Sequence, residues 1–193
     1  MELVKQTLID IWLNDILKRV RNGLITYERQ LQAEIYFNLK SKLPQDYKVW
    51  IEPVIYNLDK IKPDIIITNE DRVLSIIELK FKPWEYPDYQ YDLNKFLSFE
   101  SKSNNNLNID FGYIPISSDW RIQQGKGTKL SYRLTQDYIN CFILFGKKDS
   151  AAFNLANNKL PGNFLHLFGY IDNIEGEVNL EFKKDFYLSN QIV

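Results

Sequence analysis

The stretch KPDIIITNEDRVLSIIELKFKP, residues 62 to 83, constrains the fold more than any other part of the chain. Its two apolar runs, Ile65–Thr68 and Val73–Leu79, are typical of strands buried on both faces, and the charged turn NEDR joins them. An unpaired charge in such a strand is unfavourable. Either a divalent metal with a phosphate or a structural salt bridge must therefore compensate three charged residues of this hairpin: Asp64, Glu78 and Lys80.

Length and composition favour one globular domain spanning residues 1–193. Within it we expect a core motif region over 26–99, followed by C-terminal strands and a hairpin over 109–193. Apolar residues make up 45% of the chain and charged residues 25%, which argues against disorder. The net charge of −1 means that local patches would have to hold a nucleic-acid partner.

The first 20 residues and the cysteine content bear on location. Charged residues interrupt the N-terminal apolar pattern too often for a signal peptide or a membrane span. The lone cysteine, Cys141, excludes a disulfide within the chain and favours a reducing compartment. We therefore expect a cytoplasmic protein with no membrane partner.

The order of predicted elements favours the α/β class, with α+β as the alternative, and a mixed sheet flanked by helices. A first helix ends at Gly23 and a second spans 27–43. Strands follow, then a third helix over 89–99, then the strand IDFGYIPI, which we expect to cross over and pair in parallel on the same sheet. The segment 117–135 shows no regular pattern, and the chain ends in a predicted hairpin after the buried strand INCFILF.

Alternation along the second strand of the stretch brings its polar groups together. Side chains two apart share a face, so Glu78 and Lys80 point the same way while Leu79 faces the other layer. Asp64 falls opposite Ile77 or Glu78, depending on the register. Glu34, at the edge of the core stripe of the second helix, could add a third carboxylate.

Such a group suits metal-assisted phosphodiester cleavage. The carboxylates of Asp64 and Glu78 and the Leu79 carbonyl are hard oxygen ligands for Mg²⁺ or Mn²⁺. Lys80 can orient or help deprotonate the attacking water, or stabilise the transition state.

These residues resemble the motif of the PD-(D/E)xK nuclease superfamily: Pro63-Asp64, then Glu78-Leu79-Lys80, with Glu34 on the preceding helix. The resemblance covers about 26–99 and implies a restriction-endonuclease-like core, a Mg²⁺-dependent nuclease (a hydrolase) and DNA as substrate. It implies that Asp64 and Glu78 are metal ligands, that Lys80 is the catalytic lysine and that Glu34 is an accessory ligand. It also points to a polar pair on the next helix, Asp92 and Lys95.

Other interpretations stay open. The chain could be a catalytically silent module of the same fold that binds nucleic acid or a protein partner, or an unrelated α/β domain with a buried ion pair. A homodimer also fits, and Glu34 could be a solvated helix residue.

Two further groups have alternative roles. One basic segment could track a phosphate backbone or form a solvated loop, and its cations are Arg121, Lys126, Lys129 and Arg133. Three aromatic residues after the motif could stack on bases or belong to the core, and we predict the core: Trp84, Tyr86 and Tyr89.

Overall fold

A mixed β-sheet organises the chain in the computed structural model, which describes residues 1–105, 107–114, 128–148, 151, 160, 163–174 and 177–187. Along these residues the elements are α1 (Glu2–Asp10), η1 (Ile11–Ile16), α2 (Leu17–Arg21), α3 (Glu28–Lys42), β1 (Tyr47–Ile51), β2 (Ile65–Asn69), β3 (Arg72–Phe81), α4 (Gln90–Ser103), β4 (Asn108–Ile114), β5 (Thr128–Arg133), β6 (Ile139–Phe145), β7 (Asn163–Ile174) and β8 (Glu177–Tyr187).

The strand order is β1-β2-β3-β6-β7-β8, and the β4–β5 hairpin joins this path through β5. Strands β1, β2 and β3 run antiparallel, β6 and β7 continue in parallel to β3, and β8 returns antiparallel to β7. The strands in the middle of this order, β2, β3 and β6, are the most apolar, because both of their faces are covered. The predicted hairpin and the predicted terminal hairpin are both present.

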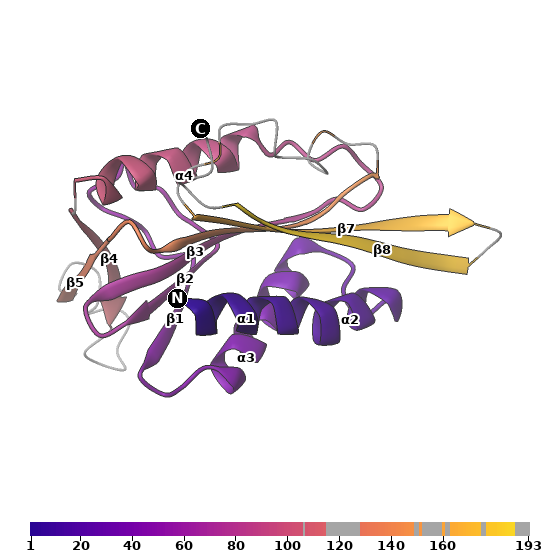
Figure 1. Cartoon of the computed structure of the whole chain (residues 1–193), viewed down its shortest axis with the longest axis horizontal. Helices are drawn as coiled ribbons and strands as arrows, with labels where there is room; N and C mark the ends of the chain where they lie inside the picture. Colours follow the sequence, from indigo (N-terminus) through magenta and orange to yellow (C-terminus); the bar gives the residue numbers. More distant parts are fainter. Residues whose placement is uncertain are drawn as a thin grey trace, which may run out of the picture.

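Helices cover the two faces of the sheet. In Figure 1, α1, α2 and α3 lie on one face and α4 lies on the other. Alternating residues of the hairpin separate accordingly: Ile77 and Leu79 join the core under α1–α3, whereas Ile76 joins the core under α4. The α/β class with a mixed sheet flanked by helices is confirmed, and the architecture is consistent with a restriction-endonuclease-like core.

The N-terminal helical region has an apolar spacing that matches its π-helical segment. Its buried residues recur every four positions, which drifts around an α-helix, and a wider π-helical segment, η1, lies between α1 and α2. The helix then stops at Gly23, as predicted. Gly23 has a φ of 68°, and the backbone N–H groups of Gly23 and Leu24 bond to carbonyls of the last turn.

Three expectations about the later elements need correction. The strand that pairs in parallel with β3 after the crossover is β6; β4 pairs with β5 instead. The uninterrupted apolar pattern of β6 suits the sheet interior, where it is buried along its whole length. The part of 117–135 that the structure describes contains a strand, β5, and α4 continues to Ser103, beyond the predicted end at 99.

Candidate functional site

The polar residues of the hairpin gather at the C-terminal end of β3. Glu78 and Lys80 both face α4, while Leu79 is buried in the core under α1–α3, so the predicted alternation is confirmed. The Glu78 side chain is only 1% exposed, and Lys80 is 25% exposed. Glu78 is thus a buried acid, and Lys80 is partly exposed on the same face of β3.

Asp64 lies directly before β2, at the end of the hairpin. The register pairs Ile65 with Ile77, which carries Asp64 opposite Glu78. The β2–β3 hydrogen-bond ladder ends at the Ile65–Ile77 pair. Beyond it, the Leu79 N–H donates to the Asp64 carboxylate, at 2.7 Å from Oδ2, and not to a backbone carbonyl of the neighbouring strand. The sequence left two registers open, and the structure has the one that brings both carboxylates together.

The backbone of Asp64 is fixed from two sides. Its carbonyl accepts a hydrogen bond from the Glu52 N–H at 2.9 Å and another from Gln32 Nε2 at 3.2 Å. Glu52 has a φ of 45°, a left-handed conformation that is unusual for a residue other than glycine. Strained residues of this kind cluster at functional sites. The carboxylate of Asp64 is therefore held in place before any ligand arrives.

Helix α4 supplies two more charged groups. Lys95 Nζ lies 2.6 Å from Glu78 Oε2 and 3.1 Å from Asp92 Oδ1, and Lys80 Nζ lies 3.0 Å from Asp92 Oδ2. The structure thus joins the polar pair of α4 to both motif residues of β3. Among the described residues, Glu78 Oε1 is buried without a hydrogen-bond partner.

The helical carboxylate at this site is Glu28, and the structure does not bring Glu34 here. Glu28 Oε2 accepts a hydrogen bond from the Phe81 N–H at 3.3 Å, whereas Glu34 pairs with Arg19 of α2 at 3.0 Å. At 100° per residue, Glu34 is about 200° around the helix from Gln32, the residue that contacts Asp64.

The position of Glu28 is visible in the sequence pattern of α3. It is three residues before Leu31 and seven before Ile35, so it extends the buried stripe of α3 towards the N-terminus. A charged residue in line with a core stripe points at the sheet. Glu34 lies beside the stripe and points at the neighbouring helix.

Burial and crowding of carboxylates shift the pKa values of the two acids. Burial raises the pKa of Asp64 to about 6, and the negative charges of Glu28 and Asp92 add to this, against the Leu79 hydrogen bond and the charge of Lys95. Burial first, and then the charge of Asp64, raise the pKa of Glu78 well above its usual value although Lys95 opposes them. A further cation beside Asp64 and Glu78 would stabilise the charged form of both carboxylates.

The two lysines shift in the direction that keeps them charged. Burial by itself lowers their pKa values, but Asp92 raises the pKa of Lys80 above 10.5, and Glu78 with Asp92 does the same for Lys95. Both side chains are therefore ammonium ions at neutral pH. Lys80 is suited to hydrogen-bond donation and charge stabilisation, and not to removing a proton from water.

Asp64→Asn should stabilise the metal-free protein at pH 8. An acid whose pKa is raised on folding contributes stability that is complete below its unfolded pKa, near 4, and lost as the pH rises through about 6. Asparagine keeps an oxygen for the Leu79 N–H and removes a buried negative charge. The nearby groups that repel this charge are Glu28, Glu52, Glu78 and Asp92, and those that attract it are Lys80, Lys95 and Arg29.

The measurement is the thermal midpoint of both proteins from pH 4 to pH 8 in chelator. We expect the variant to be more stable at pH 8 and the gap to close towards pH 4. Asp46→Asn, which replaces an exposed carboxylate, should follow the wild-type curve. A variant less stable than wild type at pH 8 would show that the charge of Asp64 supports the fold.

An open cleft of about 210 Å³ reaches Asp64, and it is lined further by Leu79, Glu28, Glu52, Arg29 and Gln32. Among the described residues, no three acidic, histidine or cysteine side chains are arranged as a ready metal site. The donors nevertheless suit a hard divalent cation. Two carboxylates with raised pKa values lie together, and Glu78 Oε1 lacks a partner.

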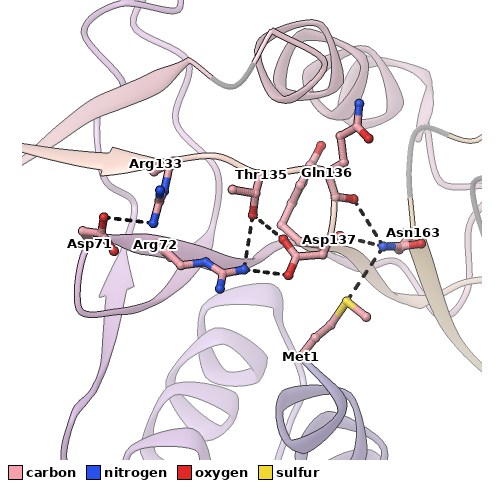
Figure 2. Close-up of polar contacts among 9 residues, drawn as sticks. Met1, Asp71, Arg72, Arg133, Thr135, Gln136, Asp137 and Asn163 are labelled. Carbon is pink, nitrogen blue, oxygen red and sulfur yellow. Dashed lines mark hydrogen bonds and ion pairs between the residues drawn. The ribbon is translucent and has the colours of Figure 1, made fainter.

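The predicted basic segment can be placed only in part. Arg121, Lys126 and the side chain of Lys129 lie outside the described residues. Arg133 pairs with Asp71 at 3.2 Å, beside the Arg72–Asp137 pair at 2.6 Å (Figure 2). Arg133 lies opposite Arg72, at the start of β3. Glu78 is six residues further along β3, so Arg133 is about 20 Å from the candidate site along the strand. Its binding to nucleic acid stays a prediction.

The aromatic residues after the motif differ from our expectation. Trp84 and Tyr86 are 55% and 60% exposed, so their assignment to the core is wrong. They follow Pro83 in an irregular segment after the end of β3. Tyr89 is partly buried and packs against the core under α4, as predicted.

Comparisons with known proteins add little to this geometry. No protein-family model matches the chain, and no curated protein matches it. A solved structure of NucC from P. aeruginosa ATCC27853 in its cAAA-bound form matches over 95% of this chain and 83% of that chain, with 12% identity and a TM-score of 0.45. A likeness of this degree carries no argument about activity. Within the described residues, no helix has the length and apolar character needed to cross a membrane.

Proposed function

We propose that this chain is a metal-dependent nuclease that hydrolyses phosphodiester bonds, with DNA as its substrate. One observation carries the proposal: Asp64 and Glu78 lie side by side at the end of a buried hairpin, both with raised pKa values, and Lys80 faces the same way as Glu78. Two neighbouring buried carboxylates whose charge is only partly compensated destabilise the fold, and the same two groups are suitable ligands for a divalent ion.

Asp64 and Glu78 would hold Mg²⁺ or Mn²⁺, with the Leu79 carbonyl as a further ligand. When bound, the ion supplies an activated water and neutralises charge that develops on the phosphate. Asp64 is prepared for this role by its fixed backbone and its Leu79 hydrogen bond. Glu78 brings the oxygen that lacks a partner, Oε1.

The other groups act on the substrate and on each other. Lys80, kept as an ammonium ion, donates to a phosphate oxygen and stabilises the additional negative charge of the transition state. Asp92 positions Lys80 through the 3.0 Å ion pair. Glu28 holds the backbone of Phe81, directly after Lys80, and so fixes the end of the strand.

A direct test uses the wild-type protein with single- and double-stranded DNA and RNA in Mg²⁺, in Mn²⁺ and in chelator. We expect cleavage only with a divalent ion, and a thermal midpoint that the ion raises, because a ligand that binds the folded state stabilises it. A protein that shows neither effect is not a metal-dependent nuclease.

One observation favours a second candidate, a catalytically silent module of the same fold. Lys95 Nζ already lies 2.6 Å from Glu78 Oε2, so an ion pair compensates part of the buried charge. The net charge of −1 also fits a subunit that does not bind DNA by itself. Metal-induced stabilisation without cleavage of any substrate would support this module.

A further inference from the structure

A pocket of about 410 Å³ lies beside the candidate site, between the α2–α3 connection and the segment that follows β3. Its volume is in the range of pockets that bind small ligands. Two exposed aromatic rings line it, Tyr27 at 54% and Trp84 at 55% exposure. Large rings that remain exposed at the mouth of a pocket indicate a binding surface.

The charged residues that line the pocket are two cations and one anion. Arg21 and Lys82 line it together with Glu85, which pairs with Lys82 at 3.0 Å. Arg21 belongs to the last turn of α2. Aromatic rings between cations suit a ligand with flat rings and an anionic backbone.

The pocket is continuous with the candidate site along the chain. Phe81 lines it and directly follows Lys80, and Tyr27 directly precedes Glu28. The hydrogen bond from the Phe81 N–H to Glu28 ties these two walls together. Thr26, also in the wall, donates from both its N–H and its hydroxyl to Gln30 Oε1, so the α2–α3 side of the pocket is held in place.

We propose that this pocket binds an unpaired nucleobase of a single-stranded nucleic acid by stacking on Trp84 and Tyr27, with Arg21 and Lys82 on the adjoining phosphates. The inference rests on the proposed function in that it names the substrate class of the same site. A base within a duplex cannot enter a pocket unless it leaves the stack, so single strands and frayed ends are the favoured ligands.

The test is a binding measurement in chelator, where metal-dependent cleavage cannot occur. Fluorescence anisotropy compares four labelled 12-mers: oligo-dT, oligo-U, a DNA duplex and an abasic DNA strand of equal charge. Wild type should bind the two strands that carry bases more tightly than the abasic strand or the duplex. Trp84→Ala and Tyr27→Ala should each weaken binding to oligo-dT by roughly tenfold, which is typical for loss of one stacked base.

Two further variants separate stacking from structural damage. Trp84→Phe keeps a stacking face and should recover most of the affinity. Tyr56→Ala removes a comparably exposed ring (49%) away from the pocket and should bind like wild type. Binding to the abasic strand should be equal in all variants, because stacking contributes nothing there.

The outcomes distinguish this inference from the proposed function. If wild type cleaves nucleic acid but Trp84→Ala and Tyr27→Ala bind oligo-dT like wild type, the pocket inference is overturned and the nuclease stands. If wild type cleaves nothing but the two variants lose single-strand binding, the inference stands for a binding module. Equal affinity of wild type for oligo-dT and the abasic strand would overturn it in either case.

Discussion

Replacing Lys80 with methionine should reduce phosphodiester cleavage by about a hundredfold or more and leave metal binding intact. Lys80 is proposed to stabilise charge on the phosphate and not to hold the ion, and loss of one such electrostatic group has effects of this size. Methionine retains the unbranched side chain as far as the position of Cε and removes the ammonium group, and Asp92 keeps its contact with Lys95 at 3.1 Å. Single-turnover cleavage rates and calorimetric titration with Mn²⁺ measure the two properties separately.

Asp64→Asn should lose metal binding as well as cleavage, in contrast to Lys80→Met. It removes a charged ligand, so cleavage and the metal-induced rise in thermal midpoint should both disappear, although the metal-free variant is expected to be more stable than wild type at pH 8. Lys48→Ala, an exposed change on β1, is the control and should cleave normally. If Lys80→Met cleaves as fast as wild type, the catalytic lysine is misassigned.

Lys95→Ala should lower the free energy of unfolding by roughly 3–5 kcal/mol in the absence of metal. The substitution leaves the buried carboxylates of Glu78 and Asp92 without the ammonium ion that lies 2.6 Å and 3.1 Å from them. The Lys95 side chain is 12% exposed and that of Glu78 1%, so water screens this pair weakly. For a protein of this length the change corresponds to a fall of about 10 °C in thermal midpoint.

The same variant decides between an ion pair and a metal site. Without Lys95, Glu78 Oε2 is free to bind a divalent ion, so Mn²⁺ should raise the thermal midpoint of Lys95→Ala by more than that of wild type. Lys62→Ala is the matched control, because Lys62 contributes only its carbonyl to Lys95, at 3.4 Å, and its exposed side chain is dispensable. If Mn²⁺ stabilises neither wild type nor Lys95→Ala, Lys95 is the cation that compensates Glu78, and the cluster is structural.

The local parts of this site could be predicted from the sequence. Side chains in a strand alternate with a period of two, so the common face of Glu78 and Lys80 and the opposite face of Leu79 follow from their spacing alone. The hairpin follows in the same way from two apolar runs around a charged turn. Helices α1 to α3 followed from apolar stripes that the structure buries.

Contacts between elements could not be predicted with the same success. Glu34 and Glu28 are both acids on α3, and the rotation of that helix against the sheet decides which one reaches the end of β3. The assignment of Trp84 and Tyr86 to the core failed for a related reason: whether a ring is covered depends on which layer lies above it.

The sequence by itself therefore determined the hairpin and the face on which Glu78 and Lys80 lie, because these depend on periodicity within one element or between neighbours in the chain. Only the tertiary structure decided the register that brings Asp64 opposite Glu78, the ion pairs from α4 and the pairing of β6 with β3. Register, helix rotation and strand order depend on packing between residues far apart in the chain, and many arrangements satisfy the same local pattern until the whole core is assembled.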